Sequence, residues 1–254
     1  KGSEKTVLGQ ERAAENRVYC FDGKNTTKWL YYAEIKSVPD NKQISPKQIE
    51  VLISNKNSGF GNSIYVNIPR LKVPIELFTL YRAMGIVSDK RICEYIVLNI
   101  ENEHSSAILE YLQGSIIDAN KHMTQEDALK YITSNVSYTP INMDKETGMK
   151  KKREFALDIL NNDVFPHCRK QEQKLYFLGY MTSELIKCAL KLRNLDDRDS
   201  YLNKRIELTG TLLNNLFRNY FNKMVKEKQK QIIREINNGS WRSTEDYENI
   251  INMT

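Results

Sequence analysis

The sequence is poor in the residues from which metal and nucleophile sites are built. Its 254 residues include four cysteines and three histidines, and no two cysteines form a CxxC pair. A structural zinc site needs clustered ligands, so we expect no bound metal. Four cysteines are enough for two disulfides, but no secretory signal pattern is seen, and free buried thiols are the better expectation.

Long apolar runs and known catalytic motifs are also absent. No stretch approaches the roughly 18 uninterrupted apolar residues of a membrane-spanning helix, so a soluble protein is expected. The sequence contains no GxSxG, P-loop, GxGxxG or HExxH motif, and it offers no nucleophile–base arrangement for a hydrolase. The hydrophobic share of 40% is too high for a disordered chain. These observations leave a folded protein of one large domain or two small ones, without a recognisable active site.

Short segments rich in β-branched and aromatic residues dominate the first part of the chain. Apolar and polar residues partly alternate in QIEVLI and in SIYVNI, which is typical of a half-buried sheet. Turn-forming residues separate the segments, for example Asp22-Gly23 and Pro39-Asp40. The simplest fit is an antiparallel meander with strands at 17–21, 30–37, 48–53 and 63–68.

Helical patterns replace the strands after Pro74. Pro74 suits the first position of a helix, and Gly85 suits the residue that closes it. Gly114 is predicted to stop a later helix, and Thr124 to cap another through a capping box. Strands first and helices afterwards predict an α+β fold, with the apolar helix 174–192 at its centre. The expected helices cover 75–84, 89–98, 107–113, 128–134, 150–161, 174–192 and 210–236, with a short last one around 245–251.

The basic residues gather in two groups. A formal charge of +6 hints at a polyanionic partner and equally fits an ordinary basic surface. The first group includes Lys151 and Lys152 at an expected helix start, where partner contact and plain solvation are equally supported. The second begins with Lys204 and Arg205 and continues along the last long helix, whose apolar stripe is expected to face a core. Phosphate contacts from either group would ignore base sequence and weaken with salt.

The only dense group of carboxylates is Asp196-Asp197-Arg198-Asp199. As a magnesium site, it would want acids at alternating positions and a phosphate substrate. As a structural element, it would be a turn at the end of a helix with internal Asp–Arg ion pairs. Arg198 and the basic residues that follow favour the ion-paired turn on charge balance.

Several phrases of the sequence resemble one known family. Residues 196–213 read DDRDSYLNKRIELTGTLL, which is similar to the DDRDxxxNKRxxLxGxLL motif of the second-largest subunit of multisubunit RNA polymerases. Further matches occur in the family's order: GSEK with QER near the start, then FTLYRAMGIVSD, VFPH and YFLGYM. The sequence departs from the motif at Ser200 and Leu202, where the family usually has His and Gly. It looks most like the eukaryotic polymerase II type, and its wealth of Asn, Lys and Ile favours a protist or a large DNA virus.

The resemblance implies a division into domains. Residues 1–14 would end the first segment of the subunit's protrusion, 15–195 would form its lobe, and 196–254 would return into the protrusion. The family's lobe is an α+β domain that forms one wall of the DNA cleft. Implied partners are DNA, the largest subunit, a small zinc-ribbon subunit and initiation factors. The implied location is the nucleus, or the virion or cytoplasmic viral factory for a viral protein.

The resemblance also implies roles for individual residues. In bacterial relatives, the counterparts of Asp199 and Lys204 face a nontemplate-strand base near the downstream edge of the bubble. The two basic groups described above, rather than the resemblance, add Arg205, Lys151 and Lys152 to the set of expected nucleic-acid contacts. The Mg²⁺ ligands belong to the largest subunit, so this region is expected to hold no cofactor and no catalytic residue. The alternative is a protein-interaction module without intrinsic DNA binding, in which the basic residues are solvated.

Overall fold

The computed structural model describes residues 2–239, apart from 24–27, 41–43, 58, 100, 102 and 140–143. The chain divides into two compact units. The larger unit is Ala14–Arg198, and the smaller one combines Lys1–Ala13 with Asp199–Thr254. The assignment of residues 15–195 to a lobe, and of the flanking parts to a protrusion, stays a prediction.

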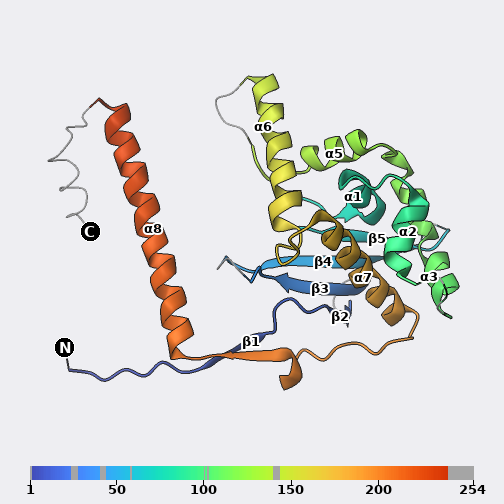
Figure 1. Ribbon diagram of the computed structural model, residues 1–254, viewed down its shortest axis with the longest axis horizontal. Coiled ribbons are helices and arrows are strands. Elements are labelled where there is room, and N and C mark those ends of the chain that lie inside the picture. The colour runs from blue at the N-terminus through green and yellow to red at the C-terminus, as the bar shows by residue number, and fades with distance from the viewer. Residues whose placement is uncertain are drawn as a thin grey trace. The chain divides into compact units, whose positions relative to one another are not determined.

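An antiparallel sheet with the strand order β2-β3-β4-β5-β6 forms one layer of the larger unit (Figure 1). The predicted meander is therefore confirmed. On β4, Ile49, Val51 and Ile53 are fully buried on one face, because every second side chain of a strand points to the same face. The strands are β2 (Tyr19–Asp22), β3 (Trp29–Ser37), β4 (Lys47–Asn57), β5 (Asn62–Asn67) and β6 (Ile75–Glu76).

Helices form the rest of the larger unit, so the expected α+β fold is confirmed. The apolar helix α7 packs against β2, β3 and β4 on one side and against α2 on another, as the prediction of a central helix requires (Figure 1). The helices are α1 (Leu77–Ala83), α2 (Asp89–Val97), α3 (Ser105–Tyr111), α4 (Gln113–Asp118), α5 (Gln125–Ser134), α6 (Lys145–Asp158) and α7 (Gln171–Ala189). A 3₁₀ turn, Ala119–Lys121, follows α4, and a π-helical turn, Ile159–Asp163, follows α6.

Two of the predicted helix signals are wrong. Pro74 does not open a helix, because Ile75–Glu76 continue the sheet as β6 and α1 begins at Leu77. Gly114 does not stop a helix but lies inside α4, where an added Cβ would come within 3.0 Å of the Gly61 carbonyl group. A close backbone approach, rather than a helix end, therefore explains that glycine.

Two other signals are confirmed. Gly85 follows α1 with a φ of 100° and donates its N–H to the Arg82 carbonyl at 3.0 Å, which is a helix-closing arrangement that favours glycine. Thr124 caps α5, because its hydroxyl oxygen accepts the Asp127 N–H at 3.1 Å. Both ends are fixed by local hydrogen bonds, and such signals can be read from sequence.

The smaller unit contains a two-stranded ribbon and a long helix. Strands β1 (Gln10–Ala13) and β7 (Lys204–Glu207) pair antiparallel, and Tyr201–Asn203 form a 3₁₀ turn before β7. Helix α8 covers Thr209–Asn237, close to its predicted bounds. Its apolar stripe is not in a core: none of its residues is buried against the parts of the chain that the structure describes. The helix expected at 245–251 lies outside the described residues.

Candidate nucleic-acid interface

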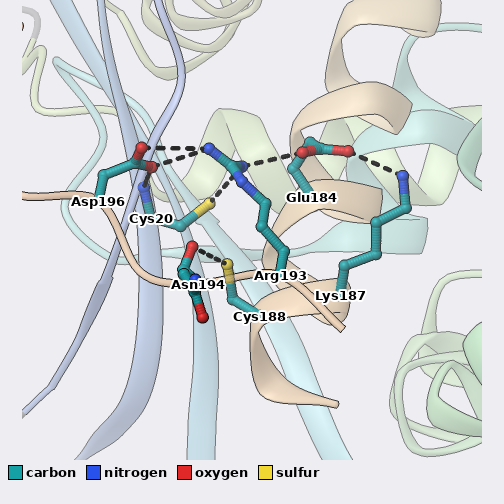
Figure 2. A network of polar contacts seen from close by, with 7 residues as sticks. All are labelled: Cys20, Glu184, Lys187, Cys188, Arg193, Asn194 and Asp196. Carbon is teal, nitrogen blue, oxygen red and sulfur yellow. Dashed lines mark hydrogen bonds and ion pairs between the residues drawn. The ribbon is translucent and has the colours of Figure 1, made fainter. Parts of the chain in front are cut away.

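Arg193 is the centre of an ion-pair network that fixes the chain where it leaves α7 (Figure 2). The chain turns out of the helix through Lys191, whose φ is 60°. The Arg193 guanidinium then pairs with Glu184 Oε2 at 2.9 Å and with Asp196 Oδ2 at 3.0 Å. Because one partner lies on α7 and the other lies beyond the turn, Arg193 joins the helix to the acidic segment that follows it.

Two thiols lie beside this network. Arg193 Nη1 is 3.6 Å from Cys20 Sγ, and the Cys188 thiol donates to the Asn194 carbonyl at 3.7 Å (Figure 2). The neighbouring Cys188 thiol and burial raise the pKa of Cys20, so Cys20 stays a neutral thiol. The four cysteines of the chain are free thiols. In this arrangement the buried sulfur atoms serve as hydrogen-bonding partners.

Asp196 ties the segment to the edge of the sheet. Its carboxylate accepts the Cys20 N–H at 2.8 Å, and its own N–H donates to the Cys20 carbonyl at 2.9 Å. Cys20 belongs to β2, which has one neighbouring strand in the sheet, β3. Asp196 therefore satisfies backbone groups that the edge of the sheet would otherwise leave open.

Arg198, the last residue of the larger unit, contacts the sheet of that unit. Its Nη2 lies 3.0 Å from Glu34 Oε2 and donates to the Tyr32 hydroxyl at 3.1 Å. Its guanidinium stacks over the Phe21 ring, 4.0 Å from the ring centroid. The sequence favoured ion pairs of Arg198 inside the acidic cluster, but its partner is Glu34. The predicted ion-paired turn is present, but the cation that pairs with Asp196 is Arg193 and not Arg198.

The predicted residues Lys204 and Arg205 lie on β7 but on opposite faces of the ribbon. Lys204 is opposite Ala13 in the register, and its Nζ is 3.7 Å from Glu11 Oε1. Arg205 is opposite Arg12, on the other face, because neighbouring residues of a strand point to opposite sides. The Lys204 side chain is only 20% exposed, whereas Arg205 is an exposed residue. A flat ligand would therefore contact one of the two cations, not both.

A second diagonal ion pair completes the ribbon. Arg12 Nε lies 3.0 Å from Glu207 Oε1, on the face of the ribbon opposite to the Lys204–Glu11 pair. Asp199, the last acid of the motif, is exposed just before the 3₁₀ turn of the smaller unit. Of the predicted site residues in this unit, Asp199 and Arg205 thus present exposed side chains, and Lys204 is held by its ion pair.

Lys151 and Lys152 lie in the interior of α6, not at its start as predicted. The helix begins at Lys145, because Asp144 caps it by accepting the Thr147 N–H at 3.0 Å. Lys151 is exposed and Lys152 half-buried. Their neighbours are paired: Lys150 with Glu146 at 3.0 Å and Arg153 with Glu126 at 3.0 Å. Because α6 begins more than a turn before Lys151, the positive end of the helix dipole does not repel these lysines.

Arg193 and Glu184 escaped prediction from the sequence. Glu184 is the only acid within 174–192, an otherwise largely apolar helix. A charged group among apolar ones is costly unless it is paired, so its presence was a signal for a fixed cationic partner. One such partner, Lys187, lies three residues along the same helix, 2.8 Å from Glu184 Oε1. The sequence alone did not show that Arg193 is the other, because only the turn at Lys191 brings it back to Glu184.

The comparisons with known proteins agree along nearly the whole chain. A family model described as RNA polymerase Rpb2, domain 2, matches residues 14–207. DNA-directed RNA polymerase II subunit RPB2 of Encephalitozoon cuniculi is 36% identical over 242 residues, covering 94% of this chain and 20% of that protein. DNA-directed RNA polymerase II subunit 2 of Arabidopsis thaliana is 32% identical over 246 residues, with 94% and 20% covered. DNA-directed RNA polymerase subunit 2 of Acanthamoeba polyphaga mimivirus is 30% identical over 247 residues, with 90% and 20% covered.

The chain thus spans about a fifth of the length of these curated relatives. The matched range begins at Ala14, where the larger compact unit begins, and ends at Glu207, where β7 ends. Every helix in the described part of the chain is too short or too polar to cross a membrane. The fold, the motif at 196–213 and the family match agree, and the chain therefore belongs to the Rpb2 family of second-largest RNA polymerase subunits, with its domain 2 at residues 14–207.

Proposed function

We propose that this chain works within a DNA-directed RNA polymerase, where it forms one wall of the DNA cleft, docks small subunits or initiation factors, and is not itself catalytic. Family membership over more than nine-tenths of the chain carries this proposal. The polymerase partners would be the largest subunit, a small zinc-ribbon subunit and initiation factors, with Mg²⁺ held in the largest subunit. The location would be the nucleus, or a virion or viral factory if the source is viral.

Exposed cations supply the contacts to DNA in this proposal. Arg205 on the ribbon and Lys151 on α6 are exposed, and Lys151 makes no ion pair with any residue that the structure describes. Lys204 joins when a phosphate group replaces Glu11, 3.7 Å away, as its partner. Such contacts to phosphate are independent of sequence. Asp199 would face a base, because a carboxylate can accept a hydrogen bond from the amino group of cytosine.

The test is salt-dependent binding of the whole chain to duplex and bubble DNA. The variant is Lys204→Ala with Arg205→Ala, and the matched control is Lys90→Ala with Arg91→Ala. The control removes the same Lys-Arg pair, also followed by isoleucine, from the exposed side of α2. Each lost phosphate contact should flatten the slope of log K against log salt by about 0.9. We expect a loss of about one contact for the variant, mainly that of Arg205, and none for the control.

The alternative is a protein-interaction module without DNA binding. Ion pairs favour it, because Lys204, Lys150 and Arg153 each have a carboxylate partner within the described residues. In that case the Lys204/Arg205 variant and the Lys90/Arg91 control would bind DNA with the same affinity and the same salt slope. That result would remove the DNA-contacting role and leave the polymerase membership unaffected.

A further inference from the structure

A groove lies between helices α5 and α6 of the larger unit. Its volume is about 430 Å³, within the range of roughly 300–1,000 Å³ typical of ligand pockets. Leu129 and Thr133 of α5 are buried at its floor, and Met149 of α6 lies over it with 57% of its surface exposed. An exposed methionine beside a buried leucine offers a soft apolar surface that adapts to an incoming side chain.

Cations surround this apolar floor. The groove is lined by four cations, Lys130, Lys150, Lys152 and Arg153, and by one acid, Glu126. Arg153 neutralises Glu126 through two hydrogen bonds of 3.0 Å, and Lys150 pairs with Glu146 at 3.0 Å. Lys130 and Lys152 make no ion pair with any residue that the structure describes, so two positive charges stand at the groove without a counter-charge.

We propose that the α5–α6 groove binds an acidic segment of a protein partner. Carboxylates of the segment would pair with Lys130 and Lys152, and one of its apolar side chains would insert between Leu129 and Met149. The proposal rests on the docking role suggested above and specifies its site and chemistry. Charge complementarity sets the sign of the partner, and the apolar floor requires that it carry a hydrophobic side chain.

Nucleic acid fits the groove less well than a peptide. None of the residues that line it is aromatic, so no ring is present on which a base could stack. A phosphate backbone would use the two lysines and leave Leu129 and Met149 without an apolar partner. Lys151 does not line the groove and remains available for the DNA contact proposed above. The two neighbouring lysines thus serve different partners.

The experiment uses the whole chain and a fluorescent peptide of about 15 residues, long enough to form an amphipathic helix, built from Glu, Asp, Leu and Ala. Two matched peptides replace its Leu by Ser, or its Glu and Asp by Lys. The protein variant is Lys130→Glu with Lys152→Glu, and the control is Lys90→Glu with Arg91→Glu on α2. All four positions are at the surface or half-buried, and a thermal melt verifies that each variant folds.

The groove proposal predicts that charge reversal at Lys130 and Lys152 weakens peptide binding by about tenfold or more, while the α2 control stays near wild type. The Ser peptide should bind more weakly than the Leu peptide, and Met149→Ser should erase that difference. Equal binding to the groove variant and the α2 control would overturn the proposal. So would a loss of DNA binding in the groove variant without any peptide binding. The DNA-binding test uses different residues, Lys204 and Arg205. Its result can therefore be interpreted even if the groove does not bind the peptide.

Discussion

Helix α7 crosses α2 at Gly179, and this crossing makes a sharp prediction. A Cβ added to Gly179 would stand 2.0 Å from the Tyr95 carbonyl oxygen and 2.6 Å from its carbonyl carbon. Both atoms belong to the backbone of α2, so no rotamer change can relieve the contact. Tyr95 and Ile96 are buried in the main core, which leaves α2 little room to retreat. Gly179→Ala must therefore push the two helices apart.

The magnitude follows from two opposing effects. Overpacking of a well-packed core costs about 1–3 kcal/mol, and a clash with backbone belongs at the upper end. Replacing glycine by alanine inside a helix stabilises the helix by roughly 0.5–1 kcal/mol, because alanine has the higher helix propensity. We expect a net loss of about 2 kcal/mol in the free energy of unfolding. For a chain of this size that corresponds to a fall in melting temperature of about 4–8 °C.

The assay is thermal and urea unfolding of the whole chain, followed by circular dichroism. The matched control is Gly210→Ala on α8, where an added Cβ meets nothing within 4 Å. The control should be neutral or slightly stabilising, because only helix propensity changes. If Gly179→Ala were as stable as Gly210→Ala, the close approach of α7 to α2 would be wrong.

Two other predictions concern a buried arginine and a half-buried histidine, and the same unfolding measurements check them. Arg82 is 1% exposed, donates to the carbonyls of Ala119 and His122, and pairs with Asp89 at 2.6 Å. Arg82→Met keeps most of the volume but leaves those groups without their donor, so we expect a loss of about 3 kcal/mol; a loss below about 1 kcal/mol would contradict this network. Burial lowers the pKa of His167, whose Nδ1 is 2.6 Å from Ser37 Oγ. As the pH falls, His167 is therefore protonated in the unfolded chain before it is protonated in the folded one. The free energy of unfolding should hold above about pH 6.5 and decline as the pH falls below it. His167→Gln should flatten that decline, and an unchanged pH profile would refute the assignment.

The strands and most helices were predictable because their signals are local. Alternation along β4, the cap at Thr124 and the closing glycine at Gly85 each act within a few residues. The errors have the opposite cause. Pro74 precedes a strand because Ile75 and Glu76 pair with β5, and position 114 is a glycine because the Gly61 backbone leaves no room for a Cβ there. These partners lie too far away in the sequence for a local pattern to reveal them.

In the candidate interface, too, some features were predictable from the sequence and others were not. The sequence by itself determined the family, since the motif at 196–213 and its companions are patterns of letters, and it singled out the residues of the predicted contact set. Only the tertiary structure decided which partners each of them meets and how exposed each of them is. Adjacent Lys204 and Arg205 separate to opposite faces because a strand alternates. Asp196 and Arg198 are held in ion pairs with Arg193 and Glu34. The sequence shows how many charged side chains there are. Which of them are free to contact a partner depends on the ion pairs that the fold forms within about 4 Å.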